Sequence, residues 1–307
     1  MKPSRLLLTG LFLISSFVAA WPQSKVTAVK VGSRIDISIN DNLFTQYVFS
    51  EDEKYPFFFP VNGPSGFSVT SMRNSLYPHH SSLFFACDRV NGGNYWQEGL
   101  ERGRIRTLRA EILKSGKDSV VIENECIWAR PGAESPIRDV RTITITAPSK
   151  DLYQIDFEIR LDMLMDVKIE KTNHSFFSAR MAPDLSAANG GKMVNAEGNQ
   201  GEQGDNGTFG KKSPWMDCYG TRNGKTEGMA ILQHPSNRWY PAPWFTRDYG
   251  FFSPTPMYWP ADETAGTQLK KGETLKLRYR VLVHSGDTGT AGIDAKFREY
   301  QKSNEVR

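Results

Sequence analysis

The stretch LYQIDFEIRL at residues 152–161 decides the fold, because isoleucine and phenylalanine side chains alternate there with charged ones. LKLRYRVLV at 275–283 and VRTITIT at 140–146 repeat the alternation. Successive side chains of a β-strand point to opposite faces of a sheet, so a period of two predicts strands with one buried and one exposed face. These three stretches therefore predict β-strands.

Other runs rich in β-branched residues extend this interpretation along the chain. They lie at 26–31, 34–39, 43–49, 105–113 and 119–128. Short polar turns such as Gly32-Ser33 separate them, which is typical of antiparallel all-β domains. Many strands joined by short turns predict a β-sandwich or a β-barrel.

One helix is predicted near the C-terminus, where Ile293, Phe297 and Tyr300 have the spacing i, i+4, i+7. Thr290 is the expected N-cap, and we expect the helix to pack on an edge or end of the sandwich. Residues 188–210 are rich in Gly and Asn and predict a long loop.

Residues 234–260 contain six prolines and many aromatic side chains. Proline disfavours a regular helix or a central strand, so this stretch predicts ordered aromatic loops.

Composition places the chain among ordinary soluble globular proteins. It has 307 residues, 39% hydrophobic and 23% charged, with a net charge of +4. This balance excludes wholesale disorder and gives no electrostatic footprint for nucleic acid. The three cysteines exclude a disulfide scaffold and a four-cysteine zinc site. We favour three buried thiols, and one disulfide plus one thiol is the alternative.

The N-terminal residues 1–20 have the pattern of a secretory signal peptide. Lys2 and Arg5 precede a short apolar stretch, and small residues end it at Ala20. Thr, Gly and Ser interrupt the stretch, which is shorter than the ~20 residues of a membrane span. We therefore expect a periplasmic or secreted protein without stable membrane insertion, folded as one β-sandwich domain over 21–307.

Adjacent histidines, His79 and His80, are the first candidates for chemistry. Histidine titrates near neutral pH and serves as acid, base or metal ligand. On a strand the two side chains would point to opposite faces, so both serve one site only in a loop, which Pro78 favours. The alternative is one buried, hydrogen-bonded ring and one solvated ring.

Further candidates lie in three segments. Asn91 and Trp96 belong to a turn whose indole is either a sugar platform or core, and Glu197 is a loop carboxylate. The proline-rich stretch adds several residues suited to a sugar site, where aromatic faces cover apolar sugar surface and polar groups bind hydroxyls. These are His234, Asn237, Trp244, Arg247, Asp248 and Tyr249. The alternative for Arg247 and Asp248 is a surface neighbour pair.

These segments, in this order, resemble a bacterial family of unknown function often labelled "methane oxygenase PmoA". The resemblance covers about residues 55–260. It rests on Pro78-His79-His80, Val90-Asn91-Gly92, Tyr95-Trp96, Asn195-Ala196-Glu197-Gly198, Trp215-Met216-Asp217-Cys218-Tyr219-Gly220, His234-Pro235-Ser236-Asn237 and Arg247-Asp248-Tyr249-Gly250-Phe251-Phe252. The chain departs from the family pattern at Ser81, Gln233 and Asp88-Arg89.

The resemblance implies a large antiparallel β-sandwich similar to the galactose-mutarotase-like supersandwich, in a protein associated with carbohydrate utilisation. The methane oxygenase label itself does not fit, because such an enzyme needs transmembrane helices and a copper site. A likeness of fold constrains function only loosely.

We therefore expect a carbohydrate-active enzyme, a glycoside hydrolase, lyase or epimerase, acting on an oligosaccharide or polysaccharide without a cofactor. The predicted catalytic residues are His79, His80, Glu197, His234 and Asp248. The predicted substrate-binding residues are Asn91, Trp96, Asn237, Trp244, Arg247 and Tyr249. Glu197 and Asp248 are the expected carboxyl pair for glycoside cleavage, whereas a His/Glu pair suits epimerisation.

Two alternatives remain open. A non-catalytic glycan-binding module would keep the aromatic side chains and Arg247 but tolerate loss of Glu197 and the histidines. A zinc or iron enzyme would use His79, His80 and His234 with a carboxylate, and it ranks last because no clustered ligand spacing is present.

Overall fold

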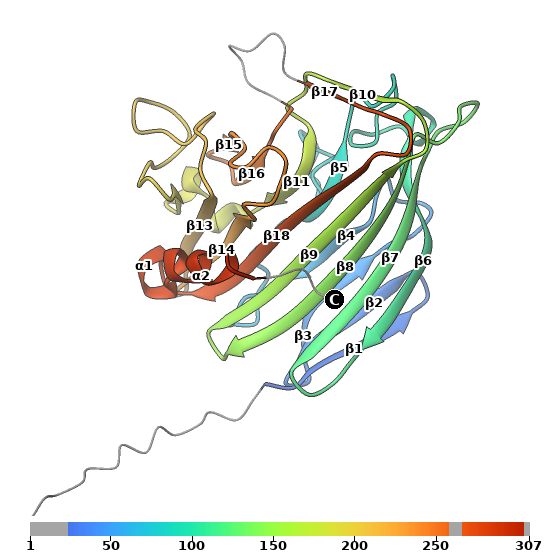
Figure 1. Ribbon diagram of the computed structural model, residues 1–307. Coiled ribbons are helices and arrows are strands. Elements are labelled where there is room, and N and C mark those ends of the chain that lie inside the picture. Colours follow the sequence, from blue (N-terminus) through green and yellow to red (C-terminus); the bar gives the residue numbers. More distant parts are fainter. Residues whose placement is uncertain (1–23, 258–265, 304–307) are drawn as a thin grey trace, which may run out of the picture.

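The alternating stretches form two eight-stranded antiparallel sheets that face each other (Figure 1). The computed structural model describes residues 24–257 and 266–303, so the predicted signal peptide lies outside the described residues. Within them, no helix combines the length and the apolar character needed to cross a bilayer.

The first sheet has the strand order β1-β2-β3-β4-β5-β11-β16-β15. Its strands are β1 (Val26–Val31), β2 (Arg34–Ile39), β3 (Asn42–Val48), β4 (Phe57–Val61), β5 (Leu83–Cys87), β11 (Ser175–Arg180), β16 (Phe251–Pro254) and β15 (Trp244–Arg247). The second sheet has the order β12-β13-β14-β18-β9-β8-β7-β6. Its strands are β12 (Lys192–Asn195), β13 (Trp215–Arg222), β14 (Lys225–Gln233), β18 (Thr274–Ser285), β9 (Leu152–Met163), β8 (Ile137–Ser149), β7 (Ser119–Ala129) and β6 (Arg104–Lys114).

Smaller elements complete the described chain. β10 (Val167–Glu170) pairs with β17 (Gly266–Leu269) in a two-stranded ribbon. The helices are α1 (Thr288–Ala291) and α2 (Ile293–Tyr300), with 3₁₀ turns at Leu100–Arg102, Pro183–Leu185 and Ala187–Asn189. The predicted all-β sandwich with a short C-terminal helix is thereby confirmed.

The predicted alternation matches the observed burial in the centre of the second sheet. β8 alternates buried and half-buried residues, and so does most of β9. Ile145 lies opposite Ile155, and Phe157 lies opposite Tyr279. Their side chains fill the space between the sheets: the ring centroids of Phe157 and Phe58 are 5.7 Å apart.

A buried ion pair lies among these apolar side chains. The Arg141 guanidinium donates to both carboxylate oxygens of Asp139 at 2.9 and 3.0 Å, and Trp128 Nε1 donates to the same carboxylate at 2.6 Å. All three residues are almost fully buried. Because a buried charge must be paired and hydrogen-bonded, this arrangement couples β7 to β8 inside the core. The three cysteines are free and buried, as favoured from the sequence.

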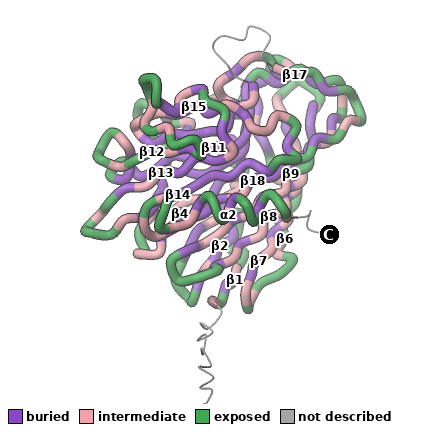
Figure 2. The backbone as a smooth tube through the Cα atoms, turned by 60° about the vertical axis from the view of Figure 1, so that its left-hand side comes forward, coloured by how far each residue is buried: buried purple, intermediate pink, exposed green. Residues whose placement is uncertain are grey.

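The C-terminal helix lies on the outer face of the second sheet, so the expectation of an edge or end was wrong (Figure 2). The outer face of β13, β14 and β18 carries an apolar patch that includes Trp215 and Leu282, and Phe297 of α2 covers it. Thr290 does not cap α2. Gly292 precedes this helix with φ 66°, a left-handed conformation that favours glycine.

Two loop predictions were also wrong in part. Residues 188–210 include β12, which pairs with β13. Residues 234–257 include β15 and β16, and β16 is an inner strand between β11 and β15. β16 is buried on both faces and so shows no alternation, and Pro254 occupies its last position. Tyr258 and Trp259 lie outside the described residues.

Candidate functional site

Three of the five histidines in the chain gather at the first sheet, on the face opposite the core. The ring centroids of His79 and His80 are 4.6 Å apart, and those of His79 and His174 are 5.6 Å apart. Phe177 of β11 stacks on Tyr279 inside the sandwich. Arg180 is three residues further along the strand, so its side chain is on the opposite, outer face, and it is in register with Phe251. His80 stacks on Phe251, which places the group on the outer face. We call His79, His80 and His174 the histidine cluster.

The local chain conformation brings two adjacent histidines to one site. The Asn74 side chain accepts hydrogen bonds from the main-chain nitrogens of Leu76 and Tyr77, which forms a turn before Pro78. Tyr55 Oη donates to the main-chain oxygen of His79. The segment is therefore an anchored loop, the condition under which both rings serve one site.

His80 is held neutral with a defined tautomer. Its ring lies between Tyr77 and Phe251, with centroid distances of 5.1 and 4.2 Å, and the residue is 3% exposed. Its Nδ1 is 2.9 Å from Arg180 Nη1. Because a guanidinium only donates, Nδ1 accepts and the proton resides on Nε2. Burial, aided by the neighbouring positive groups, lowers the pKa of His80 to about 2.

His79 forms the accessible acid–base pair of the cluster. Its Nδ1 is 2.8 Å from Glu98 Oε1, and the Glu98 side chain is 50% exposed. Burial lowers the pKa of His79, and the Glu98 carboxylate opposes this shift. Burial alone would raise the pKa of Glu98, but a main-chain hydrogen bond and the His79 ring outweigh burial, so the pKa of Glu98 is lowered. This pair has the geometry to exchange a proton with a bound molecule.

The third histidine adjoins buried polar atoms that lack partners. His174 Nδ1 is 3.4 Å from Asp88 Oδ2, and its ring centroid is 5.3 Å from that of Trp96. Asp88 Oδ1 and Trp96 Nε1 are buried without a hydrogen-bond partner in the described part of the chain. Such orphaned atoms are rare in proteins, and a bound water or ligand can supply the missing partner.

Arg180 and two tyrosines form the other side of the cluster. The rings of Tyr77 and Tyr249 stack with centroids 4.5 Å apart. The Arg180 guanidinium carbon is 5.2 Å from the Tyr77 centroid and 5.0 Å from the Tyr249 centroid. Burial lowers the pKa of Arg180 and raises that of Tyr249. The guanidinium nevertheless stays charged at any physiological pH.

Arg247, the last residue of β15, and Asp248, which follows it, hold the turn that carries Tyr249. Arg247 pairs with Glu202 at 3.0 Å. Asp248 Oδ1 accepts from the main-chain nitrogen of Glu202, and Glu202 Oε2 accepts from that of Asp248. These bonds attach the glycine-rich loop to the turn that carries Tyr249. The Asp248 carboxylate is thus engaged in a structural contact.

The structure places other predicted site residues away from this cluster. His234 and Asn237 contact Arg278 of the second sheet, where Asn237 bonds both main-chain groups of Arg278. Trp244 is buried and donates Nε1 to the main-chain oxygen of Ser213. Asn91 bonds the main chain of β10 and the segment before it.

Glu197 is exposed in the turn after β12. No contact joins it to Asp248 among the described residues. The structure therefore brings together His79, His80, Trp96 and Tyr249 of the predicted set.

Sequence reasoning missed His174, Arg180, Tyr77, Glu98 and Asp88. One signal was available for Arg180, because it ends SFFSAR (175–180), a run with no other charge. His174 precedes the same run. Among the described residues, no group of three or more His, Cys, Asp or Glu side chains is arranged to hold a metal ion.

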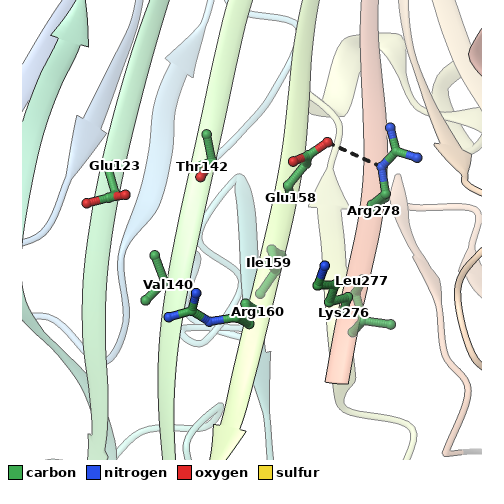
Figure 3. A pocket seen from close by; sticks show the side chains of 9 residues that line it. All are labelled: Glu123, Val140, Thr142, Glu158, Ile159, Arg160, Lys276, Leu277 and Arg278. Atoms are coloured by element: carbon green, nitrogen blue, oxygen red, sulfur yellow. Dashed lines mark ion pairs between the residues drawn. The ribbon is translucent and has the colours of Figure 1, made fainter. Parts of the chain in front are cut away.

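A separate hollow lies on the outer face of the second sheet (Figure 3). Its volume is about 200 Å³, below the usual range for small-molecule sites. Charged side chains line it, and Arg278 Nε pairs with Glu158 Oε1 at 3.4 Å. No predicted site residue lines it, so the histidine cluster is the stronger candidate.

Several solved structures are similar over most of the chain. A putative aldose 1-epimerase from Escherichia coli K12 has 11% identity and a TM-score of 0.33, covering 85% of this chain and 98% of that one. A putative aldose 1-epimerase from Klebsiella pneumoniae has 9% identity and a TM-score of 0.42, covering 92% and 88%. A GalM/aldose epimerase homologue from C. elegans has 8% identity and a TM-score of 0.36, covering 86% and 99%.

No curated protein matches the sequence. A family model matches residues 34–298, which is most of the chain. Its description agrees with a family of unknown function and does not include the methane oxygenase label. The chain belongs to the family of unknown function DUF6807.

Proposed function

We propose that this protein is a carbohydrate-active enzyme whose site is the histidine cluster on the outer face of the first sheet. One observation carries the proposal. An accessible proton-transfer pair, His79 and Glu98, lies beside the neutral ring of His80 and the aromatic faces of Tyr77 and Tyr249. Aromatic faces bind the apolar face of a sugar ring, and the polar groups bind hydroxyls or transfer protons.

The arrangement favours reactions that need one acid and one base. His79 with Glu98 supplies a group that titrates, and His80 Nε2 supplies a fixed donor. Hydrolysis by two carboxyl groups has less support, because Asp248 is engaged by Glu202 and Glu197 is exposed elsewhere. Among the three reaction classes expected from the sequence, a lyase or an epimerase therefore fits better than a glycoside hydrolase.

A non-catalytic glycan-binding module is the second candidate, and the aromatic wall of Tyr77 and Tyr249 supports it. The two candidates differ in what loss of Glu98 does. A binding module keeps its affinity for sugar when Glu98 becomes Gln, whereas an enzyme keeps binding and loses turnover.

The test is a product and binding screen of residues 21–307 against neutral and acidic oligosaccharides by mass spectrometry and calorimetry. His79→Gln and Glu98→Gln are compared with His234→Gln, a matched histidine change outside the cluster. We expect product formation to fall at least a hundredfold in the first two variants and to persist in the control. Equal activity in all three variants would contradict the proposed site.

We also propose that the mature protein is periplasmic or secreted and begins at Trp21. The support is the signal-peptide pattern of residues 1–20. N-terminal sequencing of the exported protein tests this, and an uncleaved Met1 in the cytoplasm would contradict it.

A further inference from the structure

We propose that Arg180 binds an oxyanion carried by the sugar, so that the substrate class of this site is an acidic saccharide. The inference rests on the proposed function, because it assigns the ligand of the same histidine cluster. A carboxylate, sulfate or phosphate group on the sugar would meet the same requirement, since each offers two oxygens to a guanidinium.

Arg180 differs from the other buried cations of the described chain, which are Lys54, Arg141 and Arg278. Lys54 also lacks a carboxylate partner in that part of the chain, but it donates to the main-chain oxygen of Gly99 at 2.6 Å, and burial lowers its pKa to about 8, so it can lose its charge as a guanidinium cannot. Arg141 forks onto Asp139 at 2.9 and 3.0 Å. Arg278 pairs with Glu158 at 3.4 Å. Arg180 has no carboxylate within ion-pair distance among the described residues, although it is only 4% exposed.

The Arg180 side chain makes one hydrogen bond in the described part of the chain. Nη1 donates to His80 Nδ1 at 2.9 Å, and the side chain makes no other hydrogen bond within residues 24–257 and 266–303. Neither Nε nor Nη2 is among the buried polar atoms without a partner. Both atoms therefore keep some solvent contact, and these two donor nitrogens of one planar fork have no hydrogen-bond partner among the described residues.

Burial of the Arg180 charge costs free energy. A buried cation without a counter-ion is costly, and proteins seldom keep one without a use. The Tyr77 and Tyr249 rings offset only part of this cost by cation–π contact. A sugar-borne oxyanion would supply the missing counter-charge, which makes the site more favourable when occupied than when empty.

The neighbouring donors suit the same ligand. The His80 proton is fixed on Nε2 by the Arg180 contact, and this nitrogen is likewise absent from the buried atoms without a partner. Among the described residues, the one hydrogen bond of the His80 ring is the bond that Nδ1 accepts from Arg180, and no carboxylate engages Nε2. Nε2 is across the ring from the Arg180 contact, so it can donate to another group of the same sugar. A carboxylate, which is planar, best matches the planar guanidinium.

The test is isothermal titration calorimetry with digalacturonate, neutral galactobiose, glucose 6-sulfate and glucose 6-phosphate. The last two probes separate the carboxylate from the other oxyanion sources. Wild type is compared with Arg180→Met, which keeps the stem, and with Arg280→Met. Arg280 is the matched control because it also contacts a tyrosine, Tyr300, but has its own carboxylate partner, Asp156.

We expect wild type and Arg280→Met to bind digalacturonate at least about tenfold more tightly than galactobiose, and Arg180→Met to lose this preference. Arg180→Lys keeps the charge without the fork, and we expect it to retain only part of the preference. Circular dichroism spectra and melting temperatures confirm that each variant is folded.

Two outcomes separate this inference from the proposed function. Binding of galactobiose as tightly as digalacturonate by wild type and every variant would overturn the inference and leave the histidine cluster as a neutral-sugar site. Binding of none of the four probes, together with no effect of sodium sulfate on the melting temperature at constant ionic strength, would overturn both.

Discussion

Replacing His80 with Phe should remove most of the acid sensitivity that the histidine cluster gives the fold. Phe keeps an aromatic ring between Tyr77 and Phe251 but cannot bind a proton. In the folded protein the pKa of His80 is lowered from 6.5 to about 2, chiefly by burial. Below pH 6.5 the His80 ring therefore binds a proton in the unfolded chain but not in the folded protein, so the free energy of unfolding decreases as the pH falls.

The magnitude follows from proton linkage. Each pH unit between the two pKa values costs about 1.36 kcal/mol per proton. Between pH 7.5 and 4.5 the His80 contribution falls by about 2.7 kcal/mol. The assay is urea unfolding of wild type and His80→Phe at both pH values, because all other titrating groups largely cancel in the comparison. A pH dependence equal in the two proteins to within about 1 kcal/mol would refute a buried neutral histidine.

Three further predictions concern the scaffold. Asp139→Asn should lower the free energy of unfolding by about 3–5 kcal/mol, because it leaves the Arg141 charge in the core without a counter-ion. Urea unfolding measures this change, and a loss below about 1 kcal/mol would contradict the prediction. Phe297→Ala should cost about 3–5 kcal/mol by uncovering the apolar patch under α2, and a thermal melt like that of wild type would argue against that packing. Burial alone would lower the pKa of His284, but the Asp217 carboxylate outweighs burial and raises this pKa in the folded protein. The resulting stabilisation is fully present below the pKa of His284 in the unfolded chain and should be lost as the pH rises through its pKa in the folded protein. His284→Gln should lack that alkaline loss in urea titrations at pH 6 and pH 9, and an unchanged pH profile would disprove the linkage.

Much of the fold could be predicted because one face of many strands is exposed. Where a strand borders solvent, polar and apolar residues alternate, as in β8 and β9. β16 was missed because both of its faces are buried, so its residues show no period of two. The position of α2 depended on an apolar patch assembled from four strands, β9, β13, β14 and β18, which no single segment reveals.

The candidate site could be predicted only where its residues are neighbours in the sequence. His79 and His80 are adjacent, so their joint role was open to inference. His174 and Arg180 reach the cluster because β11 pairs with β5, with Ser178 opposite Phe84. That pairing joins positions about a hundred residues apart, and strand propensity alone carries no information on such long-range register.

The most direct test of the central claim uses the five histidines as reporters. A long-range ¹H–¹⁵N spectrum of the histidine rings is recorded while galactobiose or digalacturonate is added. We predict that signals of His79, His80 and His174 shift with added sugar, and that those of His234 and His284 stay unchanged. We also predict that His80 shows the Nε2–H tautomer. Shifts confined to His234 or His284, or none at any ring with either sugar, would contradict the assignment of the histidine cluster as the sugar site.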